Sequence, residues 1–213
     1  MKQKMLGYIF IFLAFAAVVS LVYYQKINNN ISNLQILDSQ TGVKVYTNKA
    51  YGFEIQYPVN YILATNYQDK FEIGLDPYGF EANANLIASI DLPQSLYPNS
   101  NFVEAYVFID AAKNITEAKC KTFTIKVQKL SKPHDEIINS LTYYTIDYMA
   151  RKAGNYYESK TYRIMHNNIC YEINLNFHTA NFGKSPNVTI TQVNDKDVWN
   201  KLGNMLKIFK YVY

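Results

Sequence analysis

Apolar and polar residues alternate in short segments along most of the chain, in the period-two pattern of half-buried β-strands. Turn-forming residues separate these segments, for example at residues 58–60, 77–79 and 98–100. Closely spaced short strands of this kind favour a mainly antiparallel sheet. The strands are predicted at residues 43–46, 53–57, 71–75, 86–90, 103–109, 123–127, 141–149, 161–165 and 169–177.

Two segments have the composition of helices. Residues 110–120 hold good helix formers, with Asp110 or Asn114 as the N-cap. In residues 194–206, Asn194 can cap the helix. Acidic residues occupy the first turn, where their negative charge interacts favourably with the positive end of the helix dipole. One apolar stripe runs along that segment, formed by Val198, Leu202, Met205 and Leu206. Together these patterns predict an α+β fold, an antiparallel β-sheet with helices packed on it.

The strand at residues 169–177 alternates strictly, so its hairpin can be predicted in detail. Odd positions are apolar and are expected to face the core, while the even positions face the other way. A two-residue turn at Asn167 and Asn168, which tolerate left-handed backbone angles, puts Arg163 opposite Glu172. These two side chains are predicted to form a cross-strand ion pair, worth under about 1 kcal/mol if exposed.

Residues 5–24 contain no charged side chain and are apolar almost throughout. A helix of about 20 residues spans about 30 Å, the thickness of the hydrocarbon core of a bilayer. Lys2 and Lys4 precede the segment, so the positive-inside rule places the N-terminus in the cytoplasm and the rest of the chain outside. The alternative is a cleaved signal peptide, but the A-x-A pattern at residues 14–16 lies in the middle of the apolar segment.

The chain therefore has three predicted parts. Residues 1–25 form a membrane anchor or signal segment, and the polar, Asn-rich residues 26–42 form a linker. Residues 43–213 form a single extracytoplasmic domain, in the periplasm or at the cell surface. If the N-terminal segment is cleaved, this domain is secreted.

Both cysteines of the chain, Cys120 and Cys170, belong to the exported part, where disulfides form and persist. A bridge between them closes a loop of about 50 residues and contributes roughly 4 kcal/mol in the chain-entropy account. The alternative is a pair of buried free thiols. Cys170 lies on the polar face of its strand, which favours the disulfide.

The composition narrows the class of protein. With 49% hydrophobic and 18% charged residues, the chain is not a disordered or low-complexity protein. The net charge of +4 becomes +2 without Lys2 and Lys4, which leaves 19 basic against 17 acidic residues. This charge is small and scattered, so nucleic acid is not an expected partner. The 20 Tyr residues suit a recognition surface or, more simply, a bias toward A/T-rich codons.

The sequence motifs of the common enzyme classes are missing. G-x-G-x-x-G, G-x-S-x-G, H-E-x-x-H and C-x-x-C are not present. Gly74 and Gly79 have the glycine spacing of a Walker loop, but Phe80 stands where the phosphate-binding Lys is needed. No cofactor is therefore expected.

The three histidines are the remaining candidates for chemistry. His134 precedes Asp135 and Glu136 and could form a corner of a metal site, although Pro133 favours a surface turn. His166 is predicted to be a turn residue. His178 shares a strand face with Glu172, but six residues separate them by about 20 Å, too far to share a metal. No catalytic or metal residue is assigned from the sequence.

Three segments resemble PsbP/MOG-like domains. YGFEIQYPVNY from Tyr51 is similar to the first strand of these domains, and KLGNMLKIFKY from Lys201 to their closing helix and strand. YRIMHNNICYEINLNFH from Tyr162 resembles uncharacterised bacterial exported members. Tyr61 departs from the pattern, since a Trp is usual there. The resemblance implies an α/β/α sandwich and a non-catalytic binding protein, because known members assist photosystem II or bind a small nuclear GTPase.

These observations predict a non-enzymatic, membrane-anchored extracytoplasmic binding or assembly module. Its expected partners are the membrane, through the N-terminal helix, and a protein of the cell envelope. A hydrolase or metal-dependent enzyme with a scattered site, such as His134, Asp135 and a distant third group, is one alternative. A structural protein of the envelope is another.

Overall fold

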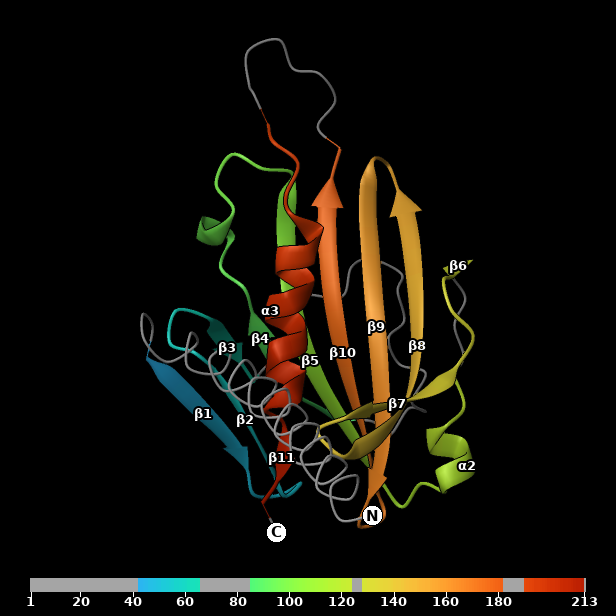
Figure 1. Ribbon diagram of the computed structural model, residues 1–213. Helices are drawn as coiled ribbons and strands as arrows, with labels where there is room; N and C mark the ends of the chain where they lie inside the picture. The colour runs from blue at the N-terminus through green and yellow to red at the C-terminus, as the bar shows by residue number, and fades with distance from the viewer. Residues whose placement is uncertain (1–41, 66–84, 124–127, 182–189, 213) are drawn as a thin grey trace, which may run out of the picture. The chain divides into compact units, whose positions relative to one another are not determined.

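Alternating side chains build a large antiparallel sheet in the computed structural model, which describes residues 42–65, 85–123, 128–181 and 190–212 (Figure 1). The sheet has eight strands in the order β3-β4-β5-β10-β9-β8-β6, with β7 also paired to β8. Its strands are β3 (Ile62–Ala64), β4 (Asn85–Asp91), β5 (Phe102–Lys113), β6 (Gln128–Lys129), β7 (His134–Ile138), β8 (Leu141–Lys152), β9 (Asn155–His166) and β10 (Ile169–Ala180). A second sheet joins β1 (Val43–Asn48), β2 (Phe53–Pro58) and β11 (Lys210–Tyr211) in the order β1-β2-β11.

Most predicted strands are confirmed. Apart from residues 123–127, of which only Phe123 is described, each predicted strand within the described part lies inside an observed strand. The hairpin is also confirmed: Asn167 and Asn168 have φ angles of 49° and 60°, and Arg163 faces Glu172 across β9 and β10. The predicted strand at residues 71–75 falls outside the described residues.

Helix α3 (Asp195–Lys207) covers one face of the large sheet, where it runs along β5 and β10 and packs against them (Figure 1). The Asn194 side chain caps it by accepting a hydrogen bond of 3.2 Å from the backbone N–H of Asp197. The predicted apolar stripe is buried against the sheet, at Val198, Leu202, Met205 and Leu206. The helix predicted at residues 194–206 is therefore confirmed.

The helix predicted at residues 110–120 is wrong for most of its length. Strand β5 continues to Lys113, and the helix that follows, α2 (Glu117–Cys120), is a single turn capped by Thr116. All four residues from Asp110 to Lys113 pair with β10, and Asp110 and Ala111 pair with β4 as well. Tertiary pairing of this kind outweighs the intrinsic helix preference of Ala and Lys.

The two faces of the large sheet differ in chemistry, and both are buried. The face toward α3 carries the apolar odd positions of β10, including Tyr171, Ile173 and Leu175, all at most 2% exposed. The opposite face carries polar residues that are equally buried, with Glu172 and Asn174 at 0%. The predicted alternation is therefore confirmed, and the polar face formed by the even positions is buried as well.

The chain divides into two compact units, Met1–Val43 and Lys44–Tyr213. Among the described residues, α3 is the one helix longer than a single turn, so a second helical layer of a sandwich is not part of them. None of the helices in the described segments is long and apolar enough to cross a membrane. The predicted span at residues 5–24 lies outside those segments.

Candidate binding site

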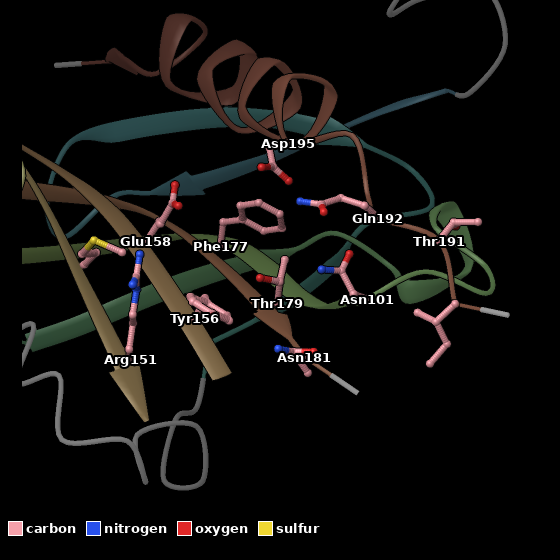
Figure 2. A pocket seen from close by; sticks show the side chains of 13 residues that line it. Asn101, Arg151, Tyr156, Glu158, Phe177, Thr179, Asn181, Thr191, Gln192 and Asp195 are labelled. Atoms are coloured by element: carbon pink, nitrogen blue, oxygen red, sulfur yellow. The ribbon is translucent and has the colours of Figure 1, made fainter. Parts of the chain in front are cut away.

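A polar pocket of about 520 Å³ opens on the α3 face of the large sheet, beyond the N-terminal end of that helix (Figure 2). Its floor is set by the register of β8, β9 and β10. Arg151 pairs with Tyr156, which pairs with Thr179, and in the next row Met149 pairs with Glu158, which pairs with Phe177.

Three polar side chains in this floor, those of Glu158, Arg151 and Thr179, have groups that do not hydrogen-bond to the surrounding described residues. Within the described part of the chain, the carboxylate of Glu158 has no hydrogen-bond or ion-pair partner. The guanidinium carbon of Arg151 lies 5.1 Å from the centre of the Tyr156 ring, a cation–π contact that orients the charge and leaves its N–H groups available. Thr179 adds a half-buried hydroxyl.

The facing wall comes from the segment that enters α3. Gln192 and Asp195 point toward the pocket from above the sheet (Figure 2). Asn101 holds this wall in place, because its backbone N–H donates to the carbonyl of Thr191 over 2.9 Å. Its side-chain oxygen accepts a 2.8 Å hydrogen bond from the N–H of Val193. The wall is therefore positioned before any ligand arrives, which lowers the entropic cost of binding.

The chemistry of the lining is hydrogen bonding. Amide, hydroxyl, carboxylate and guanidinium groups surround the opening, while the apolar side chains of Met149 and Phe177 are 8% and 4% exposed, respectively. Ordinary pockets for drug-like molecules show the reverse proportion, with few polar groups among many apolar ones. This pocket therefore suits a ligand rich in hydroxyl or amide groups.

Sequence reasoning missed the pocket because it missed one turn. Ala153 and Gly154 connect β8 to β9 with φ angles of 49° and 82°. The dipeptide Ala-Gly is a weak turn signal compared with Asn-Gly, so β9 was predicted to begin at Thr161. Extending the strand back to Asn155 brings Tyr156 and Glu158 onto the sheet.

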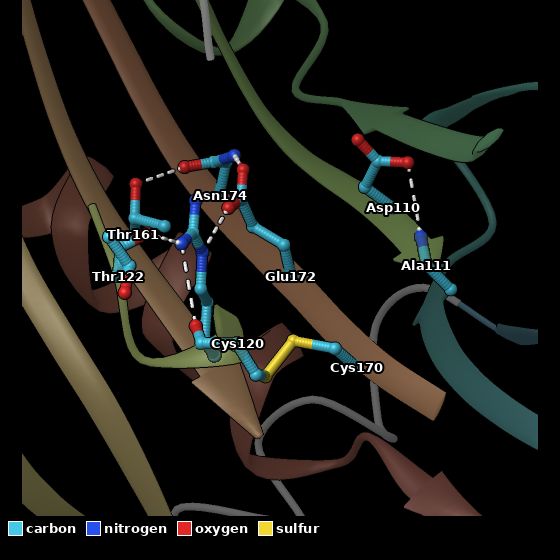
Figure 3. Close-up of polar contacts among 9 residues, drawn as sticks. Asp110, Ala111, Cys120, Thr122, Thr161, Cys170, Glu172 and Asn174 are labelled. Carbon is cyan, nitrogen blue, oxygen red and sulfur yellow. Dashed lines mark hydrogen bonds and ion pairs between the residues drawn. A yellow bond between two sulfur atoms is a disulfide. The ribbon is translucent and has the colours of Figure 1, made fainter. Parts of the chain in front are cut away.

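The buried face of the sheet carries the predicted ion pair. Arg163 Nε lies 2.5 Å from Glu172 Oε2, and the two side chains are 2% and 0% exposed. The predicted cross-strand pair is therefore present, and because it is buried the value for an exposed pair does not apply. The Arg163 guanidinium also donates to the backbone carbonyls of Thr122 and, over 3.4 Å, Cys120. Glu172 Oε1 accepts a 2.6 Å hydrogen bond from Asn174, so both charges are compensated (Figure 3).

Asp110 lies beside this pair on the neighbouring strand, directly opposite Glu172. Its Oδ1 accepts a 3.0 Å hydrogen bond from the backbone N–H of Ala111. Its Oδ2 is buried and has no hydrogen-bond partner among the described residues. Burial, and then repulsion from Glu172, raise the pKa of Asp110 from its ordinary value of 3.8 to about 7.

The two cysteines are joined. Cys120, at the end of α2, and Cys170, in β10, form a disulfide with a Cα–Cα distance of 5.7 Å (Figure 3). Both residues are buried, at 2% and 0% exposure, beside Ala112. The alternative of two free thiols is not what the structure contains.

The histidines lie apart from the pocket. His134 is exposed and begins β7, not a turn, because its backbone pairs with Thr145. His166 ends β9 and stacks on the Tyr211 ring with centroids 3.8 Å apart. His178, on the polar face, has Nε2 2.9 Å from Asn155 Oδ1. In the described segments, no three His, Cys, Asp or Glu side chains gather as a metal site.

The fold and site define an α+β domain with a structural disulfide and a polar pocket. No protein-family profile matches the chain, and no curated protein matches it. Solved structures do. LpqN from Mycobacterium tuberculosis, described as involved in cell envelope biogenesis, has 12% identity and a TM-score of 0.47 over 83% of this chain and 94% of its own.

Two further structures have similar values. The PsbP protein of Synechocystis has 9% identity and a TM-score of 0.45, over 82% of this chain and 95% of its own. A Bacteroides thetaiotaomicron protein has 12% identity and a TM-score of 0.45 over 79% of this chain. The chain spans about half of that protein, 48%. Likenesses of this size assign neither a family nor a function to the chain.

Proposed function

We propose that this chain is a non-enzymatic, membrane-anchored extracytoplasmic module that binds a component of the cell envelope. The buried disulfide between Cys120 and Cys170 carries the proposal. Disulfides persist in oxidising compartments and are rare in the cytosol. The apolar residues 5–24, preceded by Lys2 and Lys4, supply the export signal and the anchor that such a location needs.

The pocket supports the binding part of the proposal. Its walls are held by hydrogen bonds from Asn101, while Glu158 has no partner among the described residues. A fold of the PsbP/MOG type, expected from the segments at Tyr51 and Lys201, belongs to the same proposal. That class serves through binding rather than through catalysis.

The location is tested by counting thiols on the native, full-length protein in separated membrane and soluble fractions. We expect an intact chain in the membrane fraction, two hydrogen atoms lighter than its reduced form and resistant to alkylation. Two free thiols on a soluble, full-length chain would overturn the proposed compartment and the anchor together.

The binding role is tested by photo-crosslinking in intact cells. A photoreactive residue is placed at Thr191, which lines the pocket, and in a matched variant at Thr142, an exposed position on β8 outside it. We expect a discrete crosslinked product from position 191 that position 142 does not give. Equal or absent products at the two positions would count against a partner held by the pocket.

A further inference from the structure

We propose that the pocket at the end of α3 binds a neutral carbohydrate chain. The inference rests on the proposed function, an extracytoplasmic binding module, and names its ligand class. It starts from the side chains that the scaffold leaves unused. Glu158 and Asp195 have no hydrogen-bond or ion-pair partner within the described residues, and the Arg151 N–H groups face the same opening.

The charges of the lining argue against ionic ligands. One guanidinium, on Arg151, faces two carboxylates, on Glu158 and Asp195. A phosphate-rich ligand would meet more negative than positive charge here, whereas phosphate sites collect Arg, Lys and backbone N–H groups. A hydroxyl group, by contrast, donates to a carboxylate and accepts from a guanidinium or an amide. A sugar offers such hydroxyls on several sides at once.

The floor supplies the apolar contact that a sugar ring needs. Met149 and Phe177 line the base and are almost fully buried, and the half-buried Tyr156 ring lies in the neighbouring row of the same floor. The C–H faces of a pyranose ring can pack on such a floor, and its hydroxyls then reach the polar groups of the rim. An apolar ligand would leave those polar groups desolvated and unpaired, which is costly.

A peptide fits the position less well. One recurring way to bind an extended peptide is to add it as a strand to a free sheet edge. The pocket lies on the face of β9 and β10, whose backbone groups are already paired to β8 and β5 on their other sides. The backbone groups of β9 and β10 are therefore not free to bond a peptide main chain, and a ligand in the pocket contacts side chains.

The test is calorimetric titration of the full-length protein with two soluble probes, chitotetraose and maltotetraose, in a detergent that has no sugar headgroup. Titration to about 10 mM sugar detects dissociation constants as weak as about 1 mM. We expect saturable binding of at least one tetrasaccharide. Glu158→Gln and Arg151→Gln should each weaken it by about tenfold, the effect of losing a charge-assisted hydrogen bond.

Two variants outside the pocket serve as matched controls. Glu117→Gln alters an exposed acid on α2, and Lys152→Gln alters the exposed residue next to Arg151. Both should bind the sugar as the wild type does. Binding of neither sugar, or equal binding by all four variants, would overturn the proposal. A polypeptide crosslinked from Thr191 would overturn it while leaving the binding module standing, whereas free thiols on a soluble chain would overturn the module itself.

Discussion

At the scale of single residues, the buried polar face of the sheet is the costly part of this structure. Asp110 lies opposite Glu172 with one carboxylate oxygen unpaired among the described residues. Arg163 compensates Glu172 directly but Asp110 only at a distance. The carboxyl of Asp110 therefore keeps its proton in the folded state up to about pH 7, far above the unfolded chain.

This predicts a stability that falls as pH rises. Between about pH 4 and pH 7, folded Asp110 holds a proton that the unfolded chain has released, so folding takes up a proton. The loss is at most about 1.4 kcal/mol per pH unit and ends above the folded pKa. Asp110→Asn should flatten this slope in urea denaturation from pH 5 to 8, while Asp135→Asn, at an exposed position, should retain it. An unchanged slope in Asp110→Asn would contradict the assignment.

The Arg163–Glu172 pair should be expensive to break from one side. Arg163→Met leaves the buried Glu172 carboxylate without its counter-charge and should cost about 3–5 kcal/mol. The double variant Arg163→Met with Glu172→Gln removes both charges and should cost less than Arg163→Met alone. Chemical denaturation of the wild type, Arg163→Met, Glu172→Gln and the double variant, all with the disulfide intact, gives the free energies of this double-mutant cycle. If the costs of the two single variants simply add in the double variant, the two side chains are not coupled.

At the scale of elements, sequence patterns predicted the strands and α3 because these have clear periodicity and caps. The sequence patterns failed where pairing with neighbouring strands determined the structure. Ala111 and Ala112 are good helix formers, yet they lie in β5 because β4 and β10 pair with it. Polarity was also misleading on β10, where Glu172 and Asn174 are buried with partners on β9, Arg163 for Glu172 and Thr161 for Asn174. Such partners cannot be read from one segment.

The β9–β10 hairpin gives a prediction of its own. Asn168 has a φ of 60°, in the left-handed region, and its carbonyl accepts a 3.1 Å hydrogen bond from the Asn114 N–H. Asn168→Val should destabilise the protein by about 1–2 kcal/mol, because a β-branched residue is strained there. Asn168→Gly keeps the conformation accessible and should stay within about 0.5 kcal/mol of the wild type. Thermal denaturation of the two variants compares them, and equal losses would show that the turn is not under this constraint.

At the scale of the whole molecule, the sequence predicted the disulfide but not the pocket. Two cysteines in an exported chain allow a single intramolecular pairing, so the disulfide between Cys120 and Cys170 could be predicted from the sequence. The pocket instead combines β8, β9, β10 and the entry to α3, with Asn101 just before β5 and Asn181 just after β10. Only the assembled sheet brings those segments together.

The disulfide should account for a large part of the free energy of unfolding. It joins residues 50 positions apart, and the chain-entropy model gives about 4 kcal/mol for such a loop. Cys120→Ala with Cys170→Ala should lose about this amount and become insensitive to reductant, while the reduced wild type should approach the variant. A double variant as stable as the oxidised wild type would contradict this prediction.

The disulfide between Cys120 and Cys170 also links the redox state of these cysteines to the hydration of the buried Arg163 side chain. Arg163 donates to the carbonyls of Cys120 and Thr122, so the segment held by the bridge is the one that shields the guanidinium. Without the covalent link, that segment can open as a local unit while β9 and β10 stay paired. We expect water to reach Arg163 and Glu172 in that opened form before the sheet unfolds. On this reasoning, the redox state of Cys120 and Cys170 is expected to set how well water is excluded from the Arg163–Glu172 ion pair.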